Sequence, residues 1–448
     1  MRRYENLTKS EFHWINEYPA SWKLGRIKNN TYVKARIGWQ GLRSDEFILN
    51  SDWYCVTGTD FKNGTIDWEN CYCVEKERYD QDKKIQLKID DLLITKDGTI
   101  GKIALIKELP KKTTLNSGVF VTRPLMKTYN VDYFYWVLSS NVFREFIDYH
   151  KNGSTILHLY QNVFERFIFL IPSVIEQQSI AQYLDTKTEA IDKKVSFLEK
   201  KIEGYKKLKN TIIAKAVTQG IKNEQLKTND LGFKTVRSWT KSRLKDIGKL
   251  YSGLSGKSGD DFNQDNNPHN KGFIPFTNIA NNVYLDKEHL GTVVINSGEK
   301  QNKVKKGDLF FLMSSEGYED IGKTAVLADE LEEAYLNSFC KGYRVNPNKC
   351  NPYFLNYLLL SNIYRQRLIV EGKGFTRINL KMEKVTDFEV YIPKSLEEQQ
   401  AIASYLDTKT STIDKIVANI QTQITTLKTL RKTLINDVVT GKIKVCDD

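Results

Sequence analysis

The chain has 448 residues, which corresponds to two to four domains because one domain usually takes about 100–200 residues. Its 40% hydrophobic content is enough for ordinary globular cores, and its net charge of +12 favours a polyanionic partner such as nucleic acid, although a solvated lysine-rich surface gives the same balance. The first residues are too polar for a signal peptide and no apolar run approaches the ~18 residues of a membrane span, so we expect a cytoplasmic protein without a membrane partner.

The cysteines and histidines are scattered along the chain. Cys71 and Cys73 are one residue apart, no CxxC pair occurs, and no histidine lies at the spacing of metal ligands. This distribution predicts buried or incidental thiols in a reducing compartment, and no metal site.

The first part of the chain alternates β-rich runs with turn signals. The runs lie at 53–59, 92–95, 102–106 and 118–124. A helix is predicted at 132–147, followed by a polar loop at 150–159 and a strand that leads to Pro172. We therefore expect an α+β domain over residues 1–175.

A long amphipathic helix is predicted next, over residues 176–222. Its apolar residues recur in steps of four and three, which is the seam of a coiled coil. The seam residues are Ile191, Val195, Leu198 and Ile202. The pattern continues through Tyr205 and falters at Leu208. The helix itself is expected to run from about Glu176 to about Val217, which at ~1.5 Å per residue makes a rod of roughly 60 Å.

The second half repeats this order. Residues 220–233 are polar and predict a linker, 223–396 predict a second α+β domain, and 397–448 predict a second long helix. Within the second domain, a helix is expected at 352–369 and a polar loop at 371–380. The second seam consists of Ile413, Val417, Ile420 and Ile424, and it falters at Leu430.

Each helix needs a partner for its seam. The simplest partner is the other helix, packed antiparallel, and the alternative is a helix of another protein. The two are near-copies: residues 183–193 read YLDTKTEAIDK and residues 405–415 read YLDTKTSTIDK, identical at nine of eleven positions. Shorter matches include Ser140-Asn141 with Ser361-Asn362. The chain is therefore a duplication of one large module, whose helices match well and whose globular parts match poorly.

Polar and basic side chains gather in several loops of both globular parts. Arg, Lys, Gln, Asn and Glu read base edges in the major groove of DNA, whereas Ser and Thr reach phosphates. The candidates in the first domain are Lys34, Arg36, Trp39, Gln40, Arg43, Lys62, Asn63, Lys96, Ser154, Thr155 and His158. Those in the second are Lys257, Ser258, Asn278, Ser314, Ser315, Glu316, Lys373, Thr376 and Arg377. For any one residue, an ordinary solvated loop position is the alternative.

Catalytic signatures are missing. GLSGKSG at 253–259 contains Gly-Lys-Ser, but a phosphate-binding loop needs a glycine where Tyr251 stands. Asn351-Pro352-Tyr353 is similar to the NPPY of adenine methyltransferases, yet one proline is missing and no GxG loop accompanies it. No HExxH or GxSxG motif occurs. We therefore expect no catalytic residues in this chain.

The order of a variable domain, a helix start, a long helix and a second copy of all three resembles the specificity subunit of type I restriction–modification enzymes. The residues that carry the resemblance are Ile171-Pro172, Glu176-Gln177-Gln178, Ile180-Ala181, Leu184-Asp185 and Thr188, with Ile392-Pro393, Glu398-Gln399-Gln400, Ile402-Ala403, Leu406-Asp407 and Thr410. The segment from Asp91 to Gly101 is similar to a hairpin of the family's target-recognition domain. The second variable domain resembles the family less closely.

The resemblance implies an α+β fold: two α/β target-recognition domains separated by two long helices packed as an antiparallel coiled coil, with a pseudo-twofold duplication. Each domain is then expected to read one half of a bipartite, asymmetric site in double-stranded DNA, and the helices to set the spacer. It also implies two modification subunits and further restriction subunits as partners. Those partners, and not this chain, are expected to bind S-adenosylmethionine, ATP and Mg²⁺.

Two other functions stay open from the sequence. One is a stand-alone enzyme, either a divergent DNA adenine methyltransferase or a nuclease with an unrecognised centre. The other is a coiled-coil scaffold that binds only protein, which the basic charge and the two large variable domains disfavour.

Overall fold

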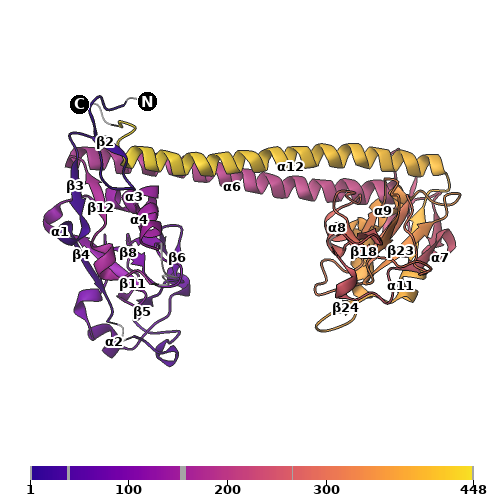
Figure 1. Cartoon of the computed structure of the whole chain (residues 1–448), viewed down its shortest axis with the longest axis horizontal. Helices are drawn as coiled ribbons and strands as arrows, with labels where there is room; N and C mark the ends of the chain where they lie inside the picture. Colours follow the sequence, from indigo (N-terminus) through magenta and orange to yellow (C-terminus); the bar gives the residue numbers. More distant parts are fainter. Residues whose placement is uncertain (1–2, 38–40, 152–157, 265, 446–448) are drawn as a thin grey trace. The chain divides into compact units, whose positions relative to one another are not determined.

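The computed structural model describes residues 3–37, 41–151, 158–264 and 266–445, and it divides into two compact units (Figure 1). The first unit comprises Met1–Glu199 with Thr422–Asp448, and the second comprises Lys200–Gln421. Each unit holds one globular domain together with a part of both long helices, α6 (Val174–Gln219) and α12 (Leu396–Val439). The predicted α+β class is confirmed, and α6 and α12 begin two residues and one residue before their predicted starts.

The first unit is built around a four-stranded antiparallel sheet with the strand order β4-β11-β8-β9. The other pairings are antiparallel β1-β2, β12-β3 and β6-β7, and parallel β10-β5. Its strands are β1 (Leu7–Lys9), β2 (Glu17–Pro19), β3 (Lys23–Arg26), β4 (Thr31–Ala35), β5 (Trp53–Val56), β6 (Phe61–Lys62), β7 (Thr65–Ile66), β8 (Leu92–Thr95), β9 (Ile103–Leu105), β10 (Lys112–Leu115), β11 (Val119–Pro124) and β12 (Ile168–Ile171). Its shorter helices are α1 (Ile27–Asn30), α2 (Lys76–Asp80), α3 (Val131–Ser139), α4 (Asn141–Lys151) and α5 (Gln161–Phe164).

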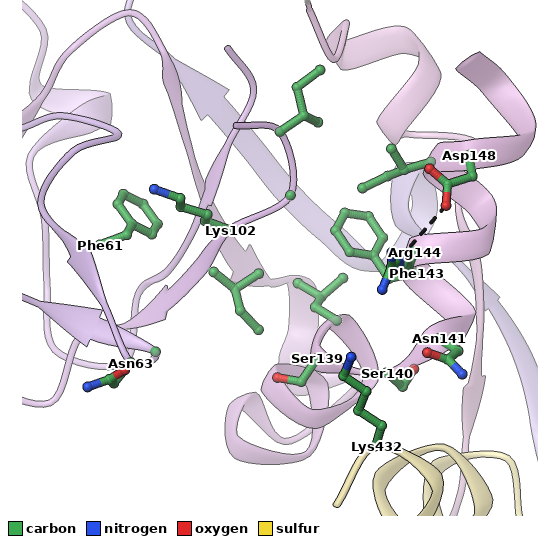
Figure 2. Close-up of a pocket in the computed structure, with 16 residues that line it drawn as sticks. Phe61, Asn63, Lys102, Ser139, Ser140, Asn141, Phe143, Arg144, Asp148 and Lys432 are labelled. Atoms are coloured by element: carbon green, nitrogen blue, oxygen red, sulfur yellow. Dashed lines mark ion pairs between the residues drawn. The ribbon is translucent and has the colours of Figure 1, made fainter. Parts of the chain in front are cut away.

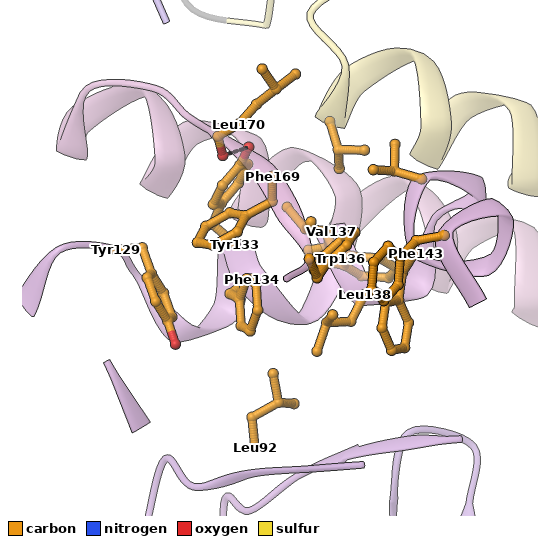
Figure 3. Close-up of a cluster of buried hydrophobic side chains, with 14 of the residues drawn as sticks. Leu92, Tyr129, Tyr133, Phe134, Trp136, Val137, Leu138, Phe143, Phe169 and Leu170 are labelled. Atoms are coloured by element: carbon orange, nitrogen blue, oxygen red, sulfur yellow. Dashed lines mark hydrogen bonds between the residues drawn. The ribbon is translucent and has the colours of Figure 1, made fainter. Parts of the chain in front are cut away.

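The central sheet is buried on both faces, because side chains alternate along each strand. Leu92, Ile94 and Phe120 point into a core that contains α3, α4 and the start of α6. Leu93 and Val121 point into a smaller core on the opposite face. Figure 3 shows the larger core, in which aromatic and aliphatic side chains of α3 pack against β12.

The second unit repeats this arrangement, with a central antiparallel sheet in the order β16-β23-β19-β21. Phe311 faces one core and Phe310 faces the other. Its strands are β13 (Leu226–Thr228), β14 (Lys234–Val236), β15 (Thr240–Arg243), β16 (Gly248–Ser252), β17 (Asn270–Ile274), β18 (Gly291–Val294), β19 (Asp308–Leu312), β20 (Ser314–Ser315), β21 (Thr324–Val326), β22 (Ala334–Leu336), β23 (Cys340–Val345), β24 (Ile378–Asn379) and β25 (Glu389–Ile392). Its shorter helices are α7 (Leu244–Ile247), α8 (Phe276–Asn281), α9 (Pro352–Leu360), α10 (Asn362–Val370) and α11 (Met382–Thr386).

Two sequence predictions need correction. The helices expected at 132–147 and 352–369 are each two helices, interrupted at Ser140 and Ser361. Both serines have extended backbone angles, and each donates its hydroxyl to a carbonyl of the preceding helix, at 2.6 Å and 2.7 Å. The predicted linker at 220–233 contains β13, which pairs with β14 in an antiparallel hairpin.

A buried glutamine near the start of each long helix binds the adjoining domain. Gln177 accepts a hydrogen bond from the backbone N–H of Asn130 at 2.6 Å and donates one to the carbonyl of Pro172 at 2.9 Å. Gln399 makes the same two bonds, with Asn351 at 2.7 Å and Pro393 at 2.8 Å. Both glutamine side chains belong to fully buried residues. The duplicated helix starts therefore fix the two globular domains in the same way.

The aspartate of each YLDTKT motif adds a second repeated contact. The indole N–H of Trp136 donates to Asp185 at 2.9 Å, and the hydroxyl of Tyr357 donates to Asp407 at 2.8 Å. Partial burial raises the pKa of Asp185 above its ordinary value. In both units, an aromatic side chain therefore donates a hydrogen bond to the long helix. It comes from α3 in the first unit and from α9 in the second.

The long helices pair through the predicted seam in each unit. Of the eight seam residues, Val195, Leu198, Ile202, Ile413, Ile420 and Ile424 are buried, and Ile191 and Val417 are half-buried. In the first unit, Asp192 pairs with Arg431 at 3.0 Å and Glu199 pairs with Lys428 at 3.2 Å. Because the residue number rises on α6 while it falls on α12, the packing is antiparallel.

Both seams change where the sequence pattern falters. Leu208 and Leu430 are 46% and 51% exposed, so they lie outside the seam. The next residue in each helix is a cation, and it binds an aspartate of the facing helix: Lys209 pairs with Asp414 at 2.7 Å in the second unit, just as Arg431 pairs with Asp192 in the first. Lys209 and Arg431 are equivalent residues of the two copies, and so are Asp192 and Asp414. Each cation binds the aspartate of the other copy, as a pseudo-twofold duplication predicts.

Replacing Gln177 by alanine is expected to lower stability by about 2–4 kcal/mol, because it leaves the N–H of Asn130 and the carbonyl of Pro172 buried without partners. Denaturant unfolding measures the shift. The matched control is Gln182→Ala, an exposed glutamine on the same helix, for which the midpoint should stay unchanged. Equal effects of both substitutions would contradict the structural role of Gln177.

Replacing a leucine of α6 by alanine is expected to lower stability at one position of the helix and not at another, depending on whether the leucine lies in the seam. Leu198→Ala should cost about 2–3 kcal/mol, because Leu198 is buried against α12. Leu208→Ala should change stability by less than about 0.5 kcal/mol, because that side chain lies outside the seam. Thermal and denaturant unfolding of the two variants decide the matter, and a larger loss at Leu208 would show that the seam is assigned wrongly.

Candidate DNA interface

Each globular domain carries two loops that meet at an edge of the domain, which we name the paired-loop edge. In the first domain it consists of the loop 96–101, which follows β8, and of His158. Asp97 and His158 form an isolated antiparallel bridge, and the N–H of Leu159 donates to the carbonyl of Lys96 at 2.7 Å. The N–H of Lys96 in turn donates to Gly118 at 2.9 Å, which ties the loop to β11.

The loop 96–101 is held in one shape. The hydroxyl of Thr95 donates to the carbonyl of Thr99 at 2.6 Å and accepts from the N–H of Lys102 at 2.9 Å. Gly101 has a φ of +84°, and a Cβ there would lie 2.8 Å from Ile147. The side chains of the loop are therefore presented from a rigid base, as recognition requires.

Lys96 and His158, which the sequence analysis proposed separately, lie together on this edge. The ammonium of Lys96 is 3.4 Å from Nε2 of His158 and 3.8 Å from the carboxylate of Asp97, and it lies over the ring of Phe120 at 5.7 Å. Nδ1 of His158 bonds to Asp97. The His158 side chain is 33% exposed and that of Lys96 is 12% exposed, so both keep a face toward solvent.

The second domain has the equivalent edge, made by residues 314–320 and 373–379. Here the bridge is a regular pairing of β20 with β24, in which Ser314 faces Asn379 and Ser315 faces Ile378. Lys373 and Asn379 exchange two backbone hydrogen bonds, of 3.0 Å and 2.9 Å. Six of the nine candidates in this domain lie on this edge: Ser314, Ser315, Glu316, Lys373, Thr376 and Arg377. The last four are exposed.

Three candidates are buried. Ser315, on the second edge, is 6% exposed and its hydroxyl accepts from the N–H of Gly317 at 3.3 Å, whereas Arg36 and Asn278 lie away from the edges and stabilise their domains. Arg36 is 1% exposed and donates to the carbonyl of Leu115 at 2.8 Å and to the amide of Gln81 at 2.9 Å. Burial lowers the pKa of its guanidinium below the ordinary value. Asn278 is fully buried and donates to the carbonyls of Asp286 and His289, at 2.8 Å and 2.7 Å. Neither side chain can reach a base edge in this fold, so we remove both from the interface.

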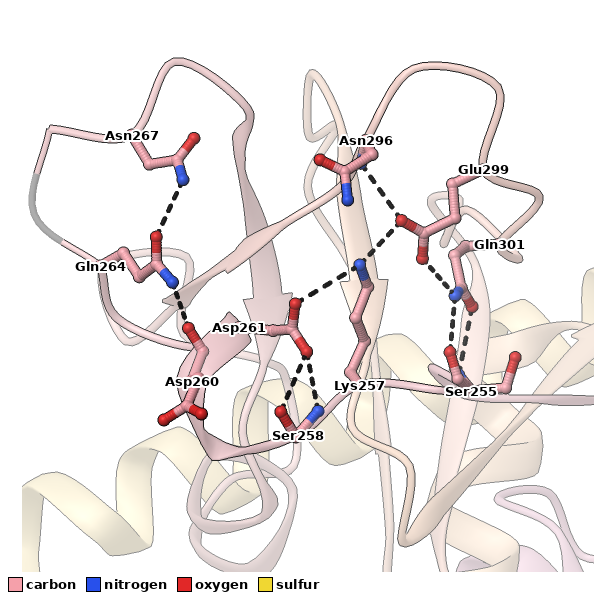
Figure 4. Close-up of polar contacts among 10 residues, drawn as sticks. All are labelled: Ser255, Lys257, Ser258, Asp260, Asp261, Gln264, Asn267, Asn296, Glu299 and Gln301. Atoms are coloured by element: carbon pink, nitrogen blue, oxygen red, sulfur yellow. Dashed lines mark hydrogen bonds and ion pairs between the residues drawn. The ribbon is translucent and has the colours of Figure 1, made fainter.

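Lys257 and Ser258 belong to a polar network that joins two loops of the second domain (Figure 4). Lys257 pairs with Glu299 at 2.7 Å and its side chain is only 5% exposed. This pairing holds the pKa of Glu299 below its ordinary value. The backbone N–H of Ser258 donates to Asp261 at 2.8 Å. The cation of Lys257 is thus neutralised within the domain and shapes the loop, whereas the hydroxyl of Ser258 remains exposed.

The other candidates are spread over the first domain. Lys34 is half-buried on β4, Arg43 is exposed, and Lys62 pairs with Asp67 at 3.1 Å. Asn63 lies at the turn between β6 and β7, with a φ of +52°. Four candidates, Trp39, Gln40, Ser154 and Thr155, lie outside the described residues.

Asn63 lines a cavity of about 550 Å³ in the first unit (Figure 2). Three basic side chains also line it: Lys102, Arg144 and Lys432. Lys432 extends from α12 toward the junction of α3 and α4, and Arg144 lies 3.9 Å from Asp148. No sequence pattern points to these cations, because they come from three segments that only the fold brings together. Two exposed aromatic residues on the second edge, Tyr318 and Phe375, likewise follow no pattern in the sequence.

Other kinds of site find little support in the part of the chain that the structure describes. Within the described ranges, no three His, Cys, Asp or Glu side chains converge as they would around a metal ion. None of the helices in those ranges is long and apolar enough to span a bilayer. The five cysteines among the described residues are buried, and burial raises the pKa of Cys55, Cys340 and Cys350 to about 12, which makes these thiols unreactive.

Comparison with known families agrees with this geometry. A family model described as "Type I restriction modification DNA specificity domain" matches residues 42–203 and 237–426, which is more than half of the chain. The chain belongs to this family. One match falls on each copy of the duplication, so this family member carries two specificity domains, and the resemblance proposed from the sequence is confirmed.

Two relatives in this family are similar to the chain over most of their length. The type I restriction enzyme MjaVIII specificity subunit of Methanocaldococcus jannaschii is 24% identical, over 99% of this chain and 98% of the relative. The EcoBI specificity subunit of Escherichia coli is 21% identical, over 79% of this chain and 74% of the relative.

Two solved structures share the fold of this specificity chain. One belongs to a study of "complex assembly" and "conformational transition of the type I R-M system"; it has a TM-score of 0.72 and 13% identity, and the match covers 95% of this chain and 99% of that one. The other is the HsdS subunit from Thermoanaerobacter tengcongensis, with a TM-score of 0.56, 14% identity and coverage of 95% and 98%.

Lys373→Ala is expected to weaken DNA binding and to reduce the slope of log affinity against log salt by about 0.9, because one exposed phosphate contact is lost from the second edge. Titrations at several salt concentrations measure both quantities. Lys227→Ala, an exposed lysine on β13 of the same unit, is the matched control and should leave the slope unchanged. Equal slopes for wild type and Lys373→Ala would remove Lys373 from the interface.

Proposed function

We propose that each specificity domain of this chain reads one half of a bipartite, asymmetric DNA site through its paired-loop edge. The observation that carries the proposal is that the same loop pairing occurs twice with different side chains: Lys96, Asp97 and His158 in one domain, and Ser314, Glu316 and Arg377 in the other. Side chains that differ in donors and acceptors read different base edges. The two half-sites should therefore differ in sequence.

We further propose that the paired helices set the spacing of the two half-sites and bind the modification subunits. The seam of buried residues supports a fixed register of the two helices. Half-sites on one face of B-DNA that are one helical turn apart are separated by ~34 Å. The duplicated outer helix faces offer two similar surfaces, which suits two copies of one modification subunit.

In this proposal the chain itself is not catalytic. Modification subunits supply S-adenosylmethionine and flip the target adenine out of the stack for methylation, whereas restriction subunits supply ATP and Mg²⁺ for translocation and cleavage. The absence of sequence motifs for these reactions supports this division. A stand-alone methyltransferase or nuclease is not favoured, because the named relatives are specificity subunits.

Methylome mapping tests the proposed function. Cells that contain the chain and its modification subunits should carry methylated adenines in one split motif with two different halves and a fixed spacer. Cells that lack only this chain should lose that motif. A motif that persists without the chain would overturn the proposal.

The spacing role of the helices has a separate test. Removing one heptad from α6 together with the facing heptad of α12 should keep the seam paired and alter the spacer that is methylated, while both half-sites keep their sequence. An unchanged spacer would exclude the helices as the device that sets it.

The non-catalytic role is tested with the purified chain alone. Incubation with labelled S-adenosylmethionine and DNA should give no methyl transfer, and addition of the modification subunits should restore it. Transfer by the chain alone would revive the enzyme alternative.

A further inference from the structure

The loop 373–379 presents one apolar side chain at its tip. Phe375 has 107% of its reference exposure, which means that no other side chain covers the ring. Single exposed apolar residues are common on proteins and by themselves indicate nothing. What sets Phe375 apart is the construction of the loop that carries it and the charge of its neighbours.

The backbone of this loop is closed at its base, which places Phe375 at the tip. Gly374 has a φ of +147°, and a Cβ there would lie 1.9 Å from the carbonyl oxygen of Arg377. The paired backbone bonds between Lys373 and Asn379 close the loop at its base. Below them, Ile378 is 3% exposed and anchors the loop in the core. In Figure 1, β24 lies at the end of the second unit that points away from α12.

The surroundings of Phe375 suit a polyanion better than an apolar protein surface. Lys373 and Arg377 lie two residues before and two residues after Phe375 in the loop, and both are exposed. The guanidinium of Arg377 lies 4.9 Å from the ring centre of Phe339, which orients it beside the loop. The carboxylate of Glu371, at the base of the loop, is paired with Lys384 at 2.8 Å. The tip therefore combines an aromatic ring with cations on both sides.

We propose that Phe375 is a wedge that inserts between stacked bases of the half-site read by the second domain. Apolar side chains such as Phe and Leu perform this task in other DNA-binding proteins, where insertion partly unstacks one base step and kinks the duplex. Lys373 and Arg377 bind the phosphates on either side of that step. The wedge rests on the proposed function. It would make recognition depend on the free energy needed to unstack one base step, in addition to the hydrogen bonds to base edges.

The first domain does not present the same feature among its described residues. When Gly153 is aligned with Gly374, the position equivalent to Phe375 is Ser154, which has no apolar side chain and lies outside the described residues. The wedge is therefore assigned to the second half-site only, and the two half-sites need not be distorted alike.

The test uses the full chain with its modification subunits and duplexes that contain the methylated motif. Each base step of the second half-site carries 2-aminopurine in turn, because its fluorescence rises when stacking is lost. Beside the rise at the target adenine that the modification subunits flip, wild type should raise the signal at one further base step. Phe375→Ala should remove that rise and weaken binding roughly tenfold, since stacking of one base on an aromatic side chain contributes about that much. Phe375→Leu, which keeps an apolar wedge, should retain most of both.

Val370→Ala is the matched control, because Val370 is 78% exposed on the same segment but lies outside the loop. It should bind and give the signal as wild type does, and all variants should unfold at the wild-type temperature. Wild-type fluorescence and affinity in Phe375→Ala would overturn the wedge while the proposed function stands. Loss of the modification subunits from Phe375→Ala, with the rise intact, would instead assign the ring to a protein contact. Failure of wild type to bind the motif would overturn the proposed function itself.

Discussion

The buried glutamine at the start of each long helix is the contact on which the arrangement of this protein depends. Its amide joins the first turn of the helix to two backbone groups of the adjoining domain, and the glutamine is fully buried. The second copy repeats the contact with the same geometry at Gln399. The recognition loops can therefore differ freely between the domains while the attachment of each domain to its helix stays constant.

The seam between the two long helices adds a second constraint, because it fixes their register. Both apolar and charged side chains contribute to it. A coiled coil with only apolar seam residues can slide by one heptad at small cost, whereas a charged residue in the seam penalises that shift. Lys209 and Arg431 occupy such positions, and each meets an aspartate of the opposite helix. As exposed ion pairs they contribute little to stability. Their effect is to make one register better than its neighbours, which a spacing device needs.

Much of this framework could be predicted from the sequence, because periodicity and duplication reveal it directly. The seam pattern identified Val195, Leu198 and their counterparts, and the faltering steps coincide with the exposed Leu208 and Leu430. The roles of single side chains are harder to predict from the sequence. Arg36 looked like a DNA contact, but it is buried by Leu115 and Gln81, which are distant in sequence. Ser140 was placed inside a helix because apolar periodicity continues across the break.

The candidate interface was predictable in composition but not in arrangement. A polar loop indicates exposure, and Lys373 and Arg377 are indeed exposed. The pairing of their loop with Ser314 and Ser315 depends on β20 and β24, two-residue strands that carry no pattern of their own. Phe375 could not be identified from the sequence, because an aromatic residue is normally assigned to a hydrophobic core. Only the fold shows that this side chain is exposed.

The central claim is that one duplicated framework holds two reading edges that act independently. The most direct measurement is the methylome of cells in which the chain carries Lys373→Ala and Arg377→Ala together. The account predicts that the half-site read by the second domain becomes relaxed, while the other half-site and the spacer stay as they are in wild type. Relaxation of both halves, or a change in the spacer, would contradict it.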